Sequence, residues 1–387
     1  MLNMFLFLAI SFLLTIILGI FIEKLRIPWI FAALLLGSFL AIYNPFQSIT
    51  SSPIFEFMAQ LGMYLLLFII GFGIDLTKLK KMKNFIIRAT FVIILFEASI
   101  GTLIIHFIFG YSWLIAFIVS LSFATVGEAI LVPILDEFKI LNTKLGQSII
   151  GIGTLDDIFE ILILIFVVFL IGHDSISNTY LNIGMIIGSI LLFIGIIFIS
   201  PKFKKVKKFQ FLDIKILFLF AIFLLFFFLG IGEYMHIEPI AALLSGIAVR
   251  RFLPKTRFKE IENELKAIVY GLFAPIFFLW VGLSMDINSI ITYPFLVLLI
   301  VVASKASKLL GSYFVGRNVL GVKKSILLGI GLSVRFSTSI IIIKILFDNG
   351  LITSDLYSII IASSIIFKFI VPILFSNLLV RWKIAKL

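Results

Sequence analysis

Long apolar runs recur along nearly the whole 387-residue chain, separated by short polar or basic segments. A helix that crosses the hydrocarbon core of a bilayer needs about 20 predominantly apolar residues, so each run predicts a membrane-spanning helix. Thirteen spans are expected, near residues 4–22, 28–45, 53–75, 84–110, 112–138, 143–172, 179–200, 211–231, 236–252, 263–287, 291–316, 322–347 and 354–380. The pattern therefore predicts an all-α membrane protein.

Composition and charge agree with this prediction. With 62% hydrophobic and only 13% charged residues, the chain has more apolar side chains than a soluble core could bury. Every second loop is basic, for example the KFKKVKK run at 202–208 and the segment from Arg250 to Lys266. Because cytoplasmic loops carry the excess of Lys and Arg, we expect a cell-membrane protein with its N-terminus outside and its C-terminus in the cytoplasm. The net charge of +12 is then explained by basic loops that set the orientation in the lipid bilayer, and no nucleic-acid partner is expected.

Two adjacent carboxylates stand inside an otherwise apolar stretch that runs from about Gly146 to Ile171. An ionised acid at the bilayer centre costs about 2.5–3.5 kcal/mol even on a lenient scale, so Asp156 and Asp157 require partners or a function. On a helix, Asp156 and Glu160 are spaced i, i+4 and share a broad polar face with Asp157. Oxygen ligands suit a hard cation such as Na⁺. The sequence thus predicts an ion or proton site in the sixth span.

Thirteen spans divide into six, one linker span and six more, so that the second set is inverted relative to the first. Inverted repeats build secondary transporters, which bind their substrate where corresponding helices are broken at the membrane midplane. The fifth span of each half carries such interruptions, with Gly127 and Glu128 in LSFATVGEAILVPIL and with Gly329, Gly331 and Arg335 in LGIGLSVRFSTSIII. The matched positions predict a pair of crossed, broken helices.

Several segments, in order and spacing, resemble the sodium/proton antiporters, and among them the second cation:proton antiporter group with its NapA-type and Kef-type members. The segments are RIPWIFAALLLG at 26–37, LLLFIIGFGIDLTKLKK at 65–81, ILNTKLGQSIIGIGTLDDIFEILIL at 140–164, FFLWVGLSMDI at 277–287 and SKLLGSYFVGR at 307–317. The resemblance covers nearly the whole chain. It implies an NhaA-like antiporter fold and an exchange of cations for protons.

The resemblance also implies roles for single residues. Asp157 matches the aspartate that binds Na⁺ and a proton in turn, and Asp156 matches its neighbour, which is acidic in electrogenic members. Lys308, in a Lys-x-x-Gly pattern, matches the lysine that pairs with that neighbour. Thr125 falls where hydroxyl or backbone oxygens often reach the ion. Glu160 is a further acid one turn past the aspartates.

Two points of the site stay open. Lys305 and Lys308 lie one turn apart in the eleventh span, and the motif register favours Lys308. Glu128 is unusual for the family at the break in the fifth span, and we hypothesise that it pairs with Arg335 across the crossing, as the half-helix dipoles favour. The alternative is that Glu128 and Arg335 are independent solvated charges in a cavity.

The residue types also limit the classes of function. The absence of cysteine excludes disulfides and thiolate metal sites. The sequence contains no glycine-rich phosphate loop that would indicate ATP-driven transport. We expect no cofactor and no enzymatic activity. An intramembrane aspartyl protease would need its two aspartates on facing helices, whereas Asp156 and Asp157 are neighbours on one helix, about 100° apart.

We therefore expect a Na⁺ (or Li⁺)/H⁺ antiporter that works by alternating access, with K⁺/H⁺ antiport or Kef-type potassium efflux as the alternative. Its core would comprise residues 84–172 and 291–383, its scaffold residues 4–75 and 211–287, and its linker helix residues 179–200. By resemblance, the scaffold would form a homodimer and the core would move against it. The ion preference and the stoichiometry are not determined by the sequence.

Overall fold

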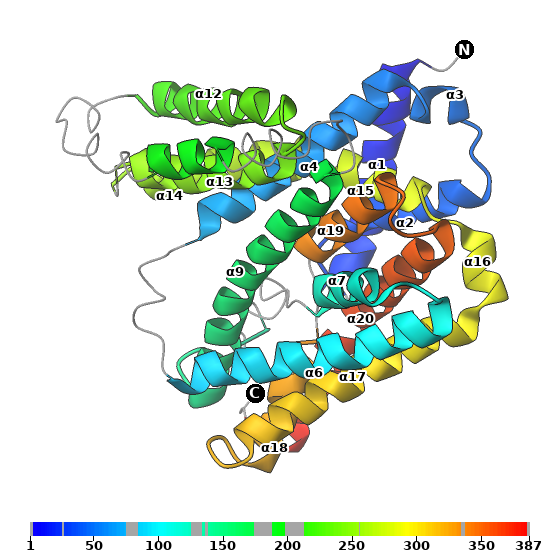
Figure 1. The fold of residues 1–387 in the computed structure, drawn as a ribbon, viewed down its shortest axis with the longest axis vertical. Helices are drawn as coiled ribbons and strands as arrows, with labels where there is room; N and C mark the ends of the chain where they lie inside the picture. Colours follow the sequence, from blue (N-terminus) through cyan, green and yellow to red (C-terminus); the bar gives the residue numbers. More distant parts are fainter. Residues whose placement is uncertain are drawn as a thin grey trace. The chain divides into compact units, whose positions relative to one another are not determined.

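The computed structural model describes residues 3–24, 27–74, 84–124, 134–135, 138–173, 188–197, 213–254, 256–333 and 337–384, and within these ranges all regular structure is helical (Figure 1). The helices in the first half are α1 (Met4–Glu23), α2 (Phe31–Ile42), α3 (Gln47–Thr50), α4 (Pro53–Gly73), α6 (Asn84–Phe109), α7 (Trp113–Phe123), α9 (Lys144–His173) and a short helix, Gly188–Ile197. The second half contains α12 (Ile214–Glu233), α13 (Glu238–Phe252), α14 (Phe258–Ile268), α15 (Ala274–Leu283), α16 (Ile287–Thr292), α17 (Pro294–Gly316), α18 (Val322–Gly331), α19 (Ser337–Asp348) and α20 (Ser354–Arg381).

The apolar runs of the sequence have become helices. In the described part of the chain, seven helices are long and apolar enough to cross a membrane, and α14 and α15 together form one of them, Phe258–Leu283. Shorter apolar helices account for further predicted spans, and each of the thirteen predicted segments contains helix within the described ranges. The all-helical membrane class is therefore confirmed, whereas the number of thirteen crossings and the inverted repeat stay predictions.

Two compact units divide the chain. Unit 1 comprises Met1–Ala9, Pro45–Asp75 and Leu164–Trp280, and unit 2 comprises Ile10–Asn44, Leu76–Ile163 and Val281–Leu387. Unit 2 thus holds α6, α17, α18, α20 and the part of α9 that carries the acids. Residues 10–44 group with this unit, although the sequence assigned them to the scaffold. The functional division into a scaffold and a moving core stays a prediction.

In unit 1, α4 and α13 pack against each other (Figure 1), and the residues that they bury are apolar or small. A Cβ atom placed on Gly246 of α13 would lie 2.7 Å from the backbone nitrogen of Phe72 of α4. A Cβ on Gly71 would lie 2.9 Å from the carbonyl carbon of Leu243. Small residues let membrane helices approach until their backbones touch, so these two glycines set the distance between α4 and α13.

The C-terminal end of α4 is bound by a side chain of α13. The Arg250 guanidinium donates to the carbonyl oxygens of Phe72 and Gly73, at 2.9 Å and 3.2 Å. It also lies over the ring of Phe258, which stacks on Phe72 with ring centroids 4.8 Å apart. The last carbonyls of a helix have no partner within it, and a cation is favoured at this end of the helix dipole. Arg250 therefore caps α4.

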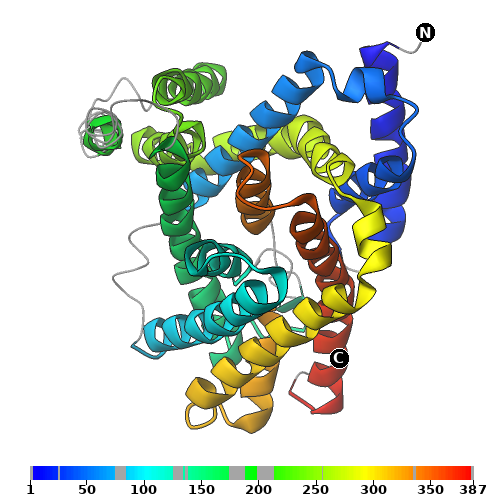
Figure 2. The same cartoon turned by 45° about the vertical axis from the view of Figure 1, so that its right-hand side comes forward.

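In unit 2, α17 lies between α6 and α18, and α6 and α17 run side by side in both views (Figures 1 and 2). A Cβ on Gly311 of α17 would lie 3.0 Å from the Cα of Ile93 on α6. On the α18 side, a Cβ on Gly329 would lie 3.0 Å from the Cα of Leu309. Glycines thus bring α17 into close contact with both neighbours.

The predicted interruption of the twelfth span is confirmed. α18 ends at Gly331 and α19 begins at Ser337, and Leu332 and Ser333 between them form a turn. In the fifth span, α7 ends at Phe123, and residues 125–133 lie outside the described residues. The tenth span holds an interruption that the sequence did not predict, because α14 and α15 are joined by a π-helical turn, Val269–Phe273.

Candidate functional site

The predicted acids lie on α9, which continues for 30 residues without a break. The Asp156 side chain is fully buried, Glu160 is 4% exposed, and Asp157 is half-buried. Asp156 and Glu160 therefore share the buried face of α9, one turn apart, while Asp157 points to a more open side. Three residues before Asp157, the Thr154 hydroxyl donates a hydrogen bond to the carbonyl oxygen of Ile150 at 2.8 Å.

Lys308 forms a buried ion pair with a glutamate of α6. The Lys308 Nζ atom lies 3.2 Å from Glu97 Oε2, and the two side chains are 0% and 1% exposed. The second carboxylate oxygen, Oε1, accepts a hydrogen bond from the hydroxyl of Ser304. Ser304 and Lys308 are spaced i, i+4 on α17, so both meet Glu97 from one face of that helix. Glu97 is thus held by α17 at two points.

The same ammonium also reaches the broken helix. Lys308 Nζ donates to the carbonyl oxygen of Leu332 at 2.7 Å. Leu332 directly follows α18, at the end where helix carbonyls lack partners within the helix and the dipole is negative. A cation is favoured in this position. Lys308 therefore links α6 and the break between α18 and α19.

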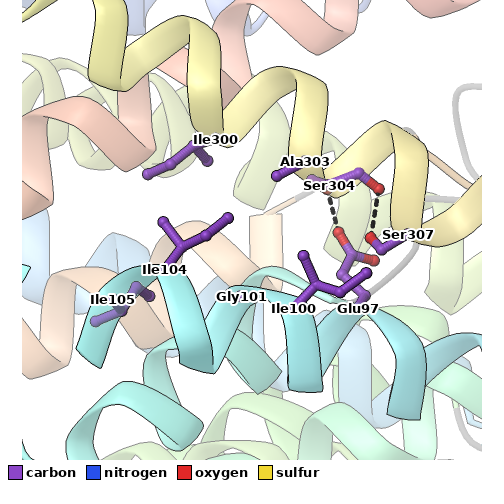
Figure 3. A pocket seen from close by; sticks show the side chains of 9 residues that line it. All are labelled: Glu97, Ile100, Gly101, Ile104, Ile105, Ile300, Ala303, Ser304 and Ser307. Carbon is purple, nitrogen blue, oxygen red and sulfur yellow. Dashed lines mark hydrogen bonds between the residues drawn. The ribbon is translucent and has the colours of Figure 1, made fainter. Parts of the chain in front are cut away.

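A cavity of about 10 Å³ borders the Glu97 carboxylate between α6 and α17 (Figure 3). Its polar end is formed by Glu97, Ser304 and Ser307, and its apolar end includes Ile104 and Ile300. Figure 3 shows the Ser307 hydroxyl turned back to the α17 backbone, where it donates to the Ser304 carbonyl oxygen at 2.8 Å. A volume of this size holds about one water molecule.

The structure separates the two candidate lysines. Lys308 is fully buried, whereas Lys305 is half-buried, with its ammonium 5.7 Å from the centroid of the Phe367 ring. The pairing of Lys308 with Asp156 stays a prediction. Its observed partner, Glu97, is an acid within the apolar fourth span, and the cost of an ionised acid in a membrane helix is the signal in the sequence that points to a buried partner for it. Thr125, Glu128 and Arg335 lie outside the described residues.

A comparison with known families agrees with the all-helical membrane fold. Residues 9–381 match the model of a family described as sodium/hydrogen exchanger, transmembrane. The chain belongs to this family. The resemblance to sodium/proton antiporters is thereby confirmed, and this sodium/hydrogen exchanger family member is a multi-pass membrane transporter of the cation/proton antiport class, not an enzyme.

Relatives of this exchanger cover most of its length. It is 28% identical over 369 residues to the probable Na⁺/H⁺ antiporter 3 of Methanocaldococcus jannaschii, covering 93% of this chain and 92% of that protein. It is 30% identical over 308 residues to the K⁺/H⁺ antiporter subunit KhtU of Bacillus subtilis, covering 78% and 74%. The structure of the sodium proton antiporter MjNhaP1 from M. jannaschii matches with a TM-score of 0.69 at 17% identity, covering 96% of this chain and 98% of that one, which shows a shared fold.

Proposed function

We propose that this exchanger moves Na⁺ or Li⁺ against H⁺ by alternating access, with the cation and the proton competing for Asp157. The observation that carries the proposal is the pair Asp156 and Asp157 on the unbroken helix α9, with Asp156 fully buried. Charged side chains inside membrane segments are costly and mark ion or proton pathways. A carboxylate can bind either a proton or a hard cation, so one site suffices for exchange.

In this proposal Asp157, Asp156 and oxygens of Thr125 bind the cation, Glu160 extends the acidic face, and Glu128 pairs with Arg335 at the crossing. The thirteen spans form two inverted six-helix repeats, and the interruption between α18 and α19 supports the crossing. The protein is a homodimer in the plasma membrane, with its N-terminus outside and its C-terminus in the cytoplasm. No cofactor takes part.

The first test is transport by purified protein in liposomes that carry a pH gradient, with Na⁺, Li⁺ and K⁺ added in turn. We expect Na⁺ and Li⁺ to collapse the gradient and the Asp157→Asn variant to abolish the response, because the amide cannot exchange a proton for a cation. An Asp157→Asn variant with native transport rates would refute the role of Asp157. The absence of any response in the native protein across pH 6 to 9 would refute the proposed function.

The second candidate is K⁺/H⁺ exchange. The 30% identity to a protein named as a K⁺/H⁺ antiporter subunit favours it over unrelated classes. The same liposomes distinguish the candidates, because only the second predicts a collapse of the gradient by K⁺.

Charge movement is a separate part of the proposal. With two acids beside the cation, two protons can exchange for one Na⁺, which moves one net charge across the membrane. The membrane potential then contributes about 2.3 kcal/mol per 100 mV to each exchange. An imposed voltage should therefore change the rate of Na⁺-driven proton movement. Rates that are indifferent to voltage would show electroneutral exchange.

A further inference from the structure

Glu97, Ser304, Lys308 and Leu332 form a buried chain of polar contacts that links α6, α17 and the end of α18. We call this set the Glu97 chain. Its ion pair is 3.2 Å long and excluded from solvent, and its last contact is the 2.7 Å hydrogen bond from Lys308 to the Leu332 carbonyl. Its last contact lies at the broken helix, where secondary transporters bind their substrate, and this position connects it with cation binding.

A lysine needs an anchor to occupy such a place reproducibly. Its ammonium is a compact point charge with three donors on a flexible stem, and several acceptors in a membrane core could attract it. Glu97 supplies the anchor from a different helix, and Ser304 fixes the carboxylate by binding its other oxygen. Separating a buried pair leaves an uncompensated charge and is strongly unfavourable. The ammonium is therefore kept beside Leu332.

We propose that Glu97 is a positioning residue for cation exchange, holding the Lys308 ammonium on the Leu332 carbonyl so that this positive charge stays out of the place that the transported cation takes. The inference rests on the function proposed above and adds a residue to it. Glu97 also balances the charge of Lys308. Without the carboxylate, the break carries one more net positive charge, which repels an incoming cation and lowers its apparent affinity.

The experiment compares Glu97→Gln, Glu97→Asp and the native protein in liposomes, with the apparent KM for Na⁺ and the maximal rate measured separately. We expect the apparent KM of Glu97→Gln to rise on the order of tenfold, the usual effect of losing a contact between charged groups. Glu97→Asp keeps the charge and should lie closer to the native KM. A merely structural role would lower the fraction of folded protein and leave the KM and the maximal rate of that fraction unchanged.

The chain offers a matched pair of serines as a control. Ser304 donates to Glu97, whereas Ser307, on the same helix and beside the same cavity, donates only to its own backbone among the contacts described for it. Ser304→Ala should therefore raise the apparent KM about threefold to tenfold, and Ser307→Ala should leave it at the native value. The Na⁺-dependent rise in unfolding temperature, which reports binding alone, should show the same order.

Each outcome bears on one of the two claims. A native protein that responds to Na⁺, together with a Glu97→Gln variant of native KM, refutes the role of Glu97 and leaves the proposed function intact. If Glu97→Gln does not fold, the serine pair decides, and equal KM values for Ser304→Ala and Ser307→Ala overturn the inference. A native protein that responds to no cation refutes the proposed function itself.

Discussion

The interfaces α4–α13 in unit 1 and α6–α17 in unit 2 both depend on glycines for the close approach of their helices, but they bury different kinds of side chain. Both bring backbones together at glycines, Gly71 and Gly246 in the first and Gly311 in the second. The residues that α4 and α13 bury are apolar or small. The α6–α17 interface instead buries the carboxylate of Glu97 and the ammonium of Lys308.

This difference separates packing from function. Membrane helices associate well through small residues alone, so an interface needs no buried charges for cohesion. A buried ion pair is weak evidence for stability, because desolvation offsets much of its attraction. The charges between α6 and α17 are therefore better explained by the placement of Lys308 at the broken helix than by cohesion. The comparison predicts different responses of the two interfaces to substitution.

The largest loss of stability is expected from Lys308→Met. The substitution removes the ammonium from a carboxylate that is 1% exposed, and breaking a buried pair from one side costs about 3–5 kcal/mol. Thermal unfolding in detergent should show this loss. The double variant Glu97→Gln with Lys308→Met should recover most of the stability, because no buried charge remains at the pair. A double variant less stable than Lys308→Met would show that the pair itself provides the cohesion.

A smaller loss is expected from Gly246→Leu in the glycine interface. A side chain at this position meets the α4 backbone at Phe72, and overpacking costs about 1–3 kcal/mol. The unfolding temperature should fall, while the apparent KM for Na⁺ of the folded fraction should stay native, because unit 1 holds none of the predicted ion ligands. A change in KM would mean that this interface also takes part in cation binding. Gly230→Leu serves as the control, since a Cβ there meets nothing within 4 Å.

The smallest effect is expected from Arg250→Lys at the end of α4. Lysine keeps the charge and loses the planar fork that reaches two carbonyls and stacks on Phe258. The lysine ammonium can still donate to one of the two carbonyls, so we expect a net loss of about 0.5–1.5 kcal/mol, the usual contribution of one hydrogen bond. A drop in unfolding temperature smaller than that of Gly246→Leu, with native transport, is the expected result. A greater loss than that of Gly246→Leu would make this cap more important to unit 1 than its glycine contact.

Much of the fold was predictable from local patterns. Apolar length predicts membrane helices regardless of their neighbours, because unpaired backbone groups are not tolerated in lipid. The break between Gly331 and Ser337 was predictable because glycines and polar residues interrupt an apolar run. The π-helical turn Val269–Phe273 was not predicted, although Gly271 lies within it and Pro275, which lacks a backbone donor, follows it. The ligand roles of Asp156 and Asp157 stay predictions.

The sequence by itself determined that the chain is a helical membrane protein, that Asp156 and Asp157 are neighbours in one membrane helix, and that a lysine in the eleventh span needs an acid. Only the tertiary structure decided that Glu97 binds Lys308 and that Lys308 rather than Lys305 is fully buried. The physical reason is that hydropathy and helix periodicity are local properties. The partner of a buried charge depends on which helices touch and on how each is rotated. Glu97 and Lys308 are 211 positions apart, so no local sequence pattern indicates their contact.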